Sequence, residues 1–250
     1  MISIIIAIII FGLIIIFHEF GHFIVAKKNG VRVEEFCVGF GPTLVGVKRG
    51  DTKYSIKLLP LGGACMMTGE DEASDDEMAF CNKSVWQRMA IVFAGPAFNF
   101  ILAFLLALIM IGCIGYDTSA VDIAEGGAAE AAGLEDGDVI TSIDGTGILV
   151  YREVANYLAL HPDKAGTTLK VTYTRDGESY ETELTPVYDE EQGRYLMGVT
   201  SIGRTRGNVI SVLGYSLYEV KYWIELTLTS LKLIFTGGVS LNDVDRKSVV

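Results

Sequence analysis

The sequence of 250 residues has little histidine and a deficit of basic residues, and both features restrict what the chain can do. Its 20 Lys and Arg face 31 Asp and Glu, so the formal net charge is −11 and no basic face for nucleic-acid phosphates is indicated. The 4 cysteines form no C-x-x-C pair, which argues against a zinc knuckle or a redox motif and favours buried thiols. With only 3 histidines, histidine chemistry is confined to few positions.

Apolar residues, by contrast, make up 50% of the chain and gather in two long runs. That share is high for a soluble domain and suits a protein that lies partly in lipid. Residues 1–28 exceed the roughly 20 needed to cross a hydrocarbon core, and they lack the basic start and cleavage site of a signal peptide. Residues 91–114 form the second run, after an acidic linker at residues 70–90. Two transmembrane helices are therefore predicted, in a polytopic α-helical membrane protein.

Two segments outside these runs have strand-like patterns. Residues 29–69 alternate short β-rich runs with Gly and Pro, which predicts a β-hairpin element. Residues 117–200 contain strand-like runs and turn signals around one helix, which predicts an inserted, compact α+β domain.

A third segment, residues 209–236, is apolar and aromatic but carries four charges. A charge at the membrane centre costs about 2.5 to 3.5 kcal/mol, so an interfacial amphipathic helix is expected here rather than a third span. The charged residues are Glu219, Lys221, Glu225 and Lys232.

The strongest chemical signal is an H-E-x-x-H motif in the first apolar run, formed by His18, Glu19 and His22. Residues four apart share one face of a helix, so both imidazoles can bind one Zn²⁺ while Glu19 lies beside a metal-held water. Zinc lowers the pKa of that water to about 7, and a carboxylate can accept its proton during attack on a peptide carbonyl. His18 and His22 are thus predicted metal ligands, and Glu19 the catalytic base and later proton donor.

The alternative is a chance match, because the motif is only five residues long. Position argues against it, since three ionisable side chains lie in a segment that is otherwise free of charge, where each is costly. The remaining histidine, His161, precedes Pro162 in the α+β domain and is expected at the surface.

Further motifs follow in a fixed order along the chain, and together with HEFGH they resemble the site-2 protease family. This ordered set is similar to the bacterial, PDZ-containing branch of these intramembrane zinc metalloproteases, typified by regulators of sigma-E. The resemblance implies zinc-dependent cleavage within transmembrane segments of single-span membrane proteins, such as anti-sigma factors or signal-peptide remnants. The motifs are HEFGH at 18–22, GFGP at 39–42, LLPLGG at 58–63 and GPAFNF at 95–100.

The resemblance also implies roles for residues outside the H-E-x-x-H motif. The hairpin region, residues 29–69, would be a membrane-associated β-hairpin element that holds the substrate as an added strand, with Gly62 and Gly63 in contact with it. Asn99 would lie near the active site and bind the substrate backbone. A plain cytoplasmic hairpin, and an Asn99 that only bonds a neighbouring helix, are the alternatives.

Residues 126–145 resemble a PDZ module, through the pattern A-G-L-x-x-G-D-x-I-x-x-I-x-G that ends at Gly145. We therefore call residues 117–200 the PDZ-like domain. PDZ modules take extended peptides by strand addition, so a peptide ligand is expected.

The resemblance implies a third zinc ligand, an aspartate of an L-D-G motif in a later span, and the sequence contains no such motif. Catalytic zinc sites generally have three protein ligands, so this chain alone is expected to be inactive. Asp243 and Asp245 are poor substitutes because neither lies in an apolar run. Residues 237–250 are expected to be a truncated tail, and the last six residues fit the family poorly enough to suggest read-through at the end of a gene fragment.

The basic residues after the first span indicate the cytoplasmic side, so the zinc site is expected toward the cytoplasm and the PDZ-like domain outside a bacterial cell membrane. Expected partners are single-span membrane substrates, the lipid bilayer and a PDZ ligand, but not nucleic acid. Two rival functions are a non-catalytic membrane PDZ adaptor with a degenerate zinc site, and a soluble zinc peptidase on a membrane anchor.

Overall fold

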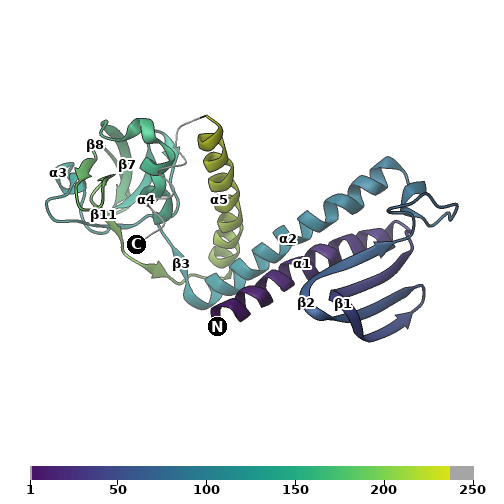
Figure 1. Ribbon diagram of the computed structural model, residues 1–250. Helices are drawn as coiled ribbons and strands as arrows, with labels where there is room; N and C mark the ends of the chain where they lie inside the picture. The colour runs from purple at the N-terminus through teal and green to yellow at the C-terminus, as the bar shows by residue number, and fades with distance from the viewer. Residues whose placement is uncertain (1, 237–250) are drawn as a thin grey trace. The chain divides into compact units, whose positions relative to one another are not determined.

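The computed structural model describes residues 2–236. The chain divides into two compact units, and the boundary between them lies within one long helix. The first unit is Met1–Leu106 and the second is Ala107–Val250. Figure 1 shows the long helices α1 and α2 with the β1–β2 region in the first unit, and a small mixed domain followed by helix α5 (Val209–Phe235) in the second. The predicted tail at residues 237–250, with Asp243 and Asp245, lies outside the described residues.

Helices α1 (Ile2–Lys28) and α2 (Val85–Ile114) form the apolar framework of the first unit. They are the two described helices that are long and apolar enough to cross a membrane, and most of their apolar surface is exposed. Gly30, with φ +68°, ends α1 in the left-handed conformation that favours glycine at this position.

Helix α2 begins six residues before the start that hydropathy predicts, at Val85 instead of residue 91. A capping box explains the difference: the Ser84 backbone N–H donates to Gln87 Oε1 (3.1 Å), and the Gln87 N–H donates to Ser84 Oγ (3.3 Å). These bonds satisfy free N–H groups at the helix start, so the helix extends into a polar segment that carries no apolar signal. The acidic linker therefore ends six residues earlier than predicted.

The predicted hairpin is a sheet of two long bent strands, β1 (Val33–Arg49) and β2 (Thr52–Met67). Phe36 pairs with Cys65 on one side and with Tyr54 on the other, so the first half of β1 lies between the two halves of β2. The second half of β1 pairs only with the first half of β2, as at Val47↔Tyr54. The far end of β2 is therefore an edge of the sheet, and it is the edge that contacts α1.

Apolar side chains from all three parts of the first unit close its small core. Ala26 of α1, Ile91 of α2 and Val33 of β1 are fully buried there, together with Val31 and Cys65. This core therefore holds the sheet edge at one position along α1.

The PDZ-like domain is built on a four-stranded antiparallel sheet in the order β6-β5-β7-β8, with helix α4 packed against its core. Its first and last strands pair with each other, β3 with β12 and β4 with β11, so both ends of the domain return to the end of α2. The elements are β3 (Tyr116–Asp117), β4 (Val121–Ile123), α3 (Ala128–Ala131), β5 (Val139–Ile143), β6 (Thr146–Gly147), α4 (Tyr151–Leu160), β7 (Leu169–Arg175), β8 (Glu178–Leu184), β9 (Val187–Asp189), β10 (Arg194–Leu196), β11 (Val199–Ser201) and β12 (Arg204–Thr205).

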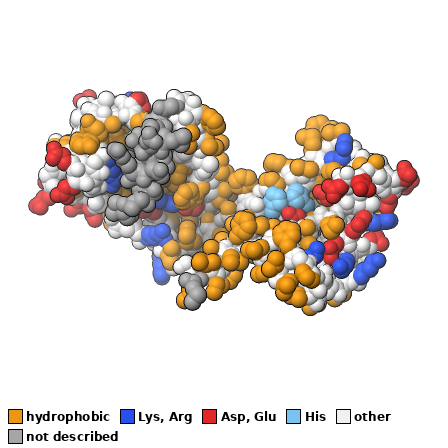
Figure 2. All heavy atoms as spheres, in the orientation of Figure 1, with side chains coloured by type: hydrophobic (Ala, Val, Ile, Leu, Met, Phe, Trp, Pro, Cys, Tyr) orange, Lys and Arg blue, Asp and Glu red, His pale blue; other side chains and the backbone are white. Residues whose placement is uncertain are grey.

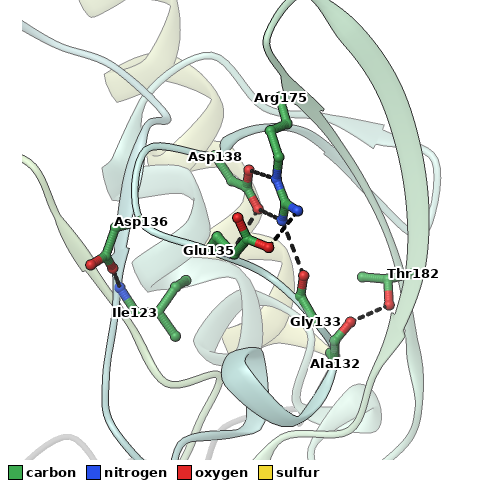
Figure 3. Close-up of polar contacts among 8 residues, drawn as sticks. All are labelled: Ile123, Ala132, Gly133, Glu135, Asp136, Asp138, Arg175 and Thr182. Carbon is green, nitrogen blue, oxygen red and sulfur yellow. Dashed lines mark hydrogen bonds and ion pairs between the residues drawn. The ribbon is translucent and has the colours of Figure 1, made fainter.

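An ion pair between Asp138 and Arg175 stabilises this domain, as Figure 3 shows. Asp138, only 1% exposed, accepts from Arg175 Nε and Nη2, both at 2.8 Å, and from the Glu135 backbone N–H at 2.9 Å. Burial by itself raises the pKa of Asp138, but the Arg175 guanidinium and the Glu135 N–H outweigh it and hold that pKa below its usual value. Arg175 also donates to the Gly133 carbonyl, so one side chain ties β7 to the turn before β5.

Candidate metal centre

The H-E-x-x-H side chains lie on one face of α1, as their spacing predicts. The rings of His18 and His22 have centroids 4.8 Å apart and meet edge to face at 77°. Both histidines and Glu19 are half-buried, and Figure 2 shows histidine atoms reaching the surface among hydrophobic side chains.

The Nε2 atoms of both histidines converge on one point against the backbone of α2. A Cβ placed on Gly95 would lie 2.6 Å from His18 Nε2 and closer still to His22 Nε2. A side chain at position 95 would therefore overlap both rings, and only glycine lets the two nitrogens lie this close to α2. Because both Nε2 atoms lie near the same point, the two nitrogens are neighbours, as two ligands of one zinc ion must be.

A backbone carbonyl sets the tautomer of His22. Its Nδ1 lies 2.7 Å from the carbonyl oxygen of Ile91, which can only accept a hydrogen bond. Nδ1 therefore carries the proton, and in the neutral ring Nε2 presents a free lone pair toward Gly95. A metal-ligating histidine is commonly oriented in this way by a partner of its other nitrogen.

Asn99 holds His18 from the same helix. The Asn99 side chain lies with Nδ2 3.2 Å from His18 Nδ1, while its Oδ1 is buried with no hydrogen-bond partner. The amide O and N are assigned from the hydrogen-bonding pattern, and the two orientations give His18 opposite tautomers. With Nδ2 toward the ring, His18 Nε2 carries the proton; with Oδ1 toward the ring, Nδ1–H donates to Oδ1 and Nε2 is a bare acceptor like that of His22. Only the second orientation suits a metal ligand.

The sheet edge meets the helix at Glu19. The Cys65 backbone N–H donates to Glu19 Oε2 at 3.0 Å, and a Cβ placed on Gly63 would lie 3.5 Å from Glu19 Cγ. Gly62 has another surrounding: its φ is +93°, and a Cβ there would clash with the ring of Phe40. Gly63 is thus beside the motif, whereas Gly62 shapes the turn next to it.

Close packing of α1 on α2 brings these groups together. A Cβ on Gly21 would overlap the carbonyl oxygen of Ala94 and lie 2.9 Å from its carbon, so the two backbones touch one residue away from both His22 and Gly95. Small residues permit this approach in apolar helices.

The structure therefore gathers His18, Glu19, His22, Asn99 and Gly63 from three elements. It also adds groups that the sequence analysis did not single out, namely Gly95, the Ile91 carbonyl and the Cys65 amide. The spacing of Gly95 and Asn99, four residues apart on one helical face, was the available signal for the first of these.

The donor set fits zinc in part. Two neutral imidazoles with aligned lone pairs suit Zn²⁺, whose catalytic sites generally take three protein ligands. Within residues 2–236, no group of three His, Cys, Asp or Glu side chains is placed to hold a metal ion. Within the described residues, His18 and His22 could supply two of the three protein ligands that a catalytic zinc site generally has.

Comparisons with known proteins agree with this chemistry. The model of peptidase family M50 matches residues 6–247. A Clostridium acetobutylicum protein named as a candidate zinc metalloprotease is 36% identical over 243 residues, covering 97% of this chain and 71% of its own. The regulator of sigma-W protease RasP of Bacillus subtilis is 25% identical over 321 residues, covering 94% of this chain and 75% of its own.

Among solved structures, the PDZ domain of an SdrC-like protein from Listeria monocytogenes is 26% identical and covers 36% of this chain and 92% of its own, with a TM-score of 0.30.

Proposed function

We propose, since this chain belongs to peptidase family M50 and is a metalloprotease, that His18 and His22 bind zinc and that Glu19 is the catalytic base of an intramembrane endopeptidase. The observation that carries the proposal is that the Nε2 atoms of both histidines lie side by side against Gly95 of α2. The third protein ligand is proposed to come from outside residues 2–236.

Zinc bound there would supply a Lewis acid and lower the pKa of a water held by the ion. The protein's own residues supply the rest. Glu19, one residue from His18, accepts and later returns a proton through a carboxylate oxygen, while the Cys65 N–H holds the other end of that carboxylate in place. Ile91 and Asn99 keep both imidazoles in the tautomer that leaves Nε2 free.

The proposed substrate is a transmembrane segment of a single-span membrane protein. A helix hides its peptide bonds in its own hydrogen bonds, so it must be unwound and held extended before hydrolysis. The edge of β2 lies beside Glu19 at Gly63 and Cys65, where an extended segment can add as a further strand next to the proton acceptor. The name of the Bacillus subtilis relative suggests anti-sigma factors as substrates, and signal-peptide remnants are the second candidate.

A membrane location agrees with the family and with the two long apolar helices. We propose a bacterial cell membrane, crossed more than once, with the zinc site toward the cytoplasm. Lys27 and Lys28 at the end of α1 support this orientation, because basic residues favour the cytoplasmic side. The PDZ-like domain would then lie outside and bind a peptide.

The first experiment measures zinc content and cleavage together. The chain, and a form extended by an L-D-G-bearing span, are purified in detergent as wild type, Glu19→Gln and His22→Ala. We expect one zinc per extended chain and cleavage of a model single-span substrate. Glu19→Gln should keep zinc and lower cleavage by about 10²- to 10⁴-fold, the usual share of a general base, whereas His22→Ala should lose both.

Two other outcomes would redirect the proposal. Zinc binding without Glu19-dependent cleavage would leave Glu19 with a structural role only. Failure of both wild-type forms to hold zinc would favour the non-catalytic PDZ adaptor.

A further inference from the structure

The edge of β2 that meets α1 carries two outward-facing backbone N–H groups, and a carboxylate binds each of them. The Cys65 N–H donates to Glu19 Oε2 at 3.0 Å, and the Met67 N–H donates to Glu70 Oε2 at 3.3 Å. The Thr68 N–H, next along the chain, donates on the opposite side, to the carbonyl of the residue before β1, at 3.0 Å. Successive N–H groups of a strand alternate between its two sides, so those of Cys65 and Met67 belong to one row along the free edge.

Glu70 takes the place of a further strand at Met67. Its backbone N–H donates to the Met67 carbonyl at 3.3 Å, while its side chain accepts from the Met67 N–H. In an antiparallel pair, a residue of the neighbouring strand exchanges these same two bonds with its partner. Glu70 therefore imitates one residue of an added strand, and the edge that is open to another chain ends before Met67.

The turn that carries Glu70 is held by the segment that follows the acidic linker's loop. The Thr68 carbonyl accepts from the Phe80 N–H at 2.8 Å, and the Gly69 carbonyl accepts from the Cys81 N–H at 3.2 Å. Gly69 has φ +72°, the left-handed conformation that glycine adopts without strain. The backbone before Glu70 is thus bonded on both residues of the turn, so Glu70 has a defined position at the end of the edge.

This position is close to the reacting groups. Strand residues rise about 3.3 Å each, so Met67 lies about 6.6 Å along the edge from Cys65, which holds Glu19. The pKa of Glu70 is raised above its usual value, first by partial burial and also by the charge of Glu19. Glu70 therefore blocks the edge about two strand residues from the point where Glu19 would meet a peptide bond.

A substrate that binds as an added strand needs a feature of this kind, because backbone bonds alone do not fix its register. The donors and acceptors of an antiparallel edge repeat every two residues, so a strand that slides by two residues makes the same bonds with the same faces. Apolar side chains recur throughout a transmembrane segment and distinguish poorly between such registers. Each slide would bring a different peptide bond to Glu19.

We propose that Glu70 is a positioning residue that fixes the register of the substrate on β2, and so selects which peptide bond is cut. The substrate strand advances along the edge until it meets Glu70 at Met67, and the peptide bond that then lies at Glu19 is hydrolysed. This inference rests on the strand addition and the cleavage in the proposed function. Glu70 does not touch the reacting atoms, so its loss should move the cleavage position and not abolish cleavage.

Mass spectrometry of the cleavage products tests the proposal. The chain extended by an L-D-G-bearing span cuts a model single-span substrate in detergent, and each product is assigned to a peptide bond. Glu70→Ala frees the Met67 N–H, and an antiparallel strand that advances toward Met67 moves in its own N-terminal direction. We therefore expect a new cut two residues nearer the C-terminus of the substrate. Its share of the product should rise by about 2- to 10-fold, the range that one added hydrogen bond supplies.

Two matched variants separate the edge contact from charge. Glu70→Gln keeps an oxygen acceptor for Met67, and Asp71→Ala removes an equal charge from the next residue, so both should cut at the wild-type bond. Wild-type products from Glu70→Ala as well would overturn the register role and leave the proposed protease intact. A shift in all three variants would also overturn it, because charge or a loosened loop would then be the cause. If the wild-type extended form cuts nothing, the proposed function fails and this inference fails with it.

Photo-cross-linking gives a readout that needs no hydrolysis. A benzophenone amino acid replaces Met66, which is 49% exposed in the same strand, in a Glu19→Gln background. The substrate residue that it captures should move by two positions in Glu70→Ala and stay in place in Glu70→Gln. An unmoved cross-link in Glu70→Ala, or cross-links already spread over several registers with Glu70 present, would show that Glu70 does not set the register.

Discussion

The two units of this protein use charged and polar groups in opposite ways. In the PDZ-like domain, Asp138 is deeply buried, and its carboxylate is satisfied by Arg175 and a backbone N–H of the same domain. In the first unit, His18 and His22 have one nitrogen each bound by α2, while the other nitrogen lies beside Gly95 with no hydrogen-bond partner among the described residues. Both arrangements are ordered, but only the second leaves atoms available to a ligand.

Whether a polar group has a free lone pair distinguishes candidate ligands from groups that only stabilise the fold more clearly than its burial does. A buried group whose hydrogen-bonding capacity is used within its own domain stabilises that domain. A polar group in an apolar helix whose neighbours orient it, yet leave its lone pair free, is a candidate ligand. Substitutions in each unit should therefore affect different properties.

The largest effect is expected from Asp138→Ala. It removes the buried acceptor of two Arg175 bonds and of the Glu135 backbone N–H, and hydrogen bonds to a charged group typically contribute about 1.5 to 3 kcal/mol each to stability. Arg175 keeps its bonds to Glu135 Oε1 and to the Gly133 carbonyl. Hydrogen exchange of β5 and β7 in the full chain should speed up accordingly, while zinc content stays at the wild-type level. Glu181→Ala is the control, because its pair with Lys170 is more than half exposed on both sides and should contribute at most about 1 kcal/mol. Loss of zinc in Asp138→Ala would break the proposed independence of the two units.

Gly95→Ala should have the next largest effect, and on the other unit. The added methyl would overlap both imidazole rings and displace their Nε2 atoms, so zinc affinity should fall by about 100-fold or more, at the upper end of what neighbours of a metal site usually contribute. Gly112→Ala is the matched control on the same helix, since nothing lies within 4 Å of its added methyl. Competition with a zinc chelator measures both. Equal affinity in the two variants would contradict the placement of the metal.

Asn99→Leu is expected to weaken zinc binding by about 10- to 100-fold, because the His18 Nδ1 proton loses its acceptor. Asn99→Asp keeps an oxygen acceptor and should restore most of the affinity. A structural role alone, or contact with substrate alone, predicts no such rescue in a zinc titration without substrate. The absorption spectrum of bound Co²⁺ would show whether both variants keep the same ligand geometry.

The sequence was sufficient for the motif and the family because that information is local. The two histidines and Glu19 lie within five consecutive residues, and helix geometry alone places them on one face. The resemblance to site-2 proteases was confirmed by the family match. The start of α2 was wrong by six residues, although Ser84 and Gln87 form a capping box that is readable in the sequence.

The remainder of the site could not be read from the sequence. The partner of His22 is the carbonyl of Ile91, 69 residues away, and every residue has such a carbonyl. The contact between Cys65 and Glu19 depends on the fold of β1 between both halves of β2, which is a tertiary register with no local signature. The partners of the histidine Nδ1 atoms are thus set by helix packing.

The smallest expected effect is the pH dependence of the PDZ-like domain, and it sharpens the comparison without altering the site. The pKa of Asp138 is lower in the folded state than the value of about 3.9 in an unfolded chain, so its stabilising contribution is complete above that value and is lost as pH falls toward the folded pKa. One proton limits the slope to about 1.4 kcal/mol per pH unit. Asp138→Asn does not titrate, so its β5 and β7 amides, corrected for intrinsic exchange rates, should show a shallower loss of protection below pH 4 than wild type. Equal slopes would mean that other carboxylates carry the acid sensitivity. They would also mean that the folded protein stabilises the charged form of Asp138 no more than water does.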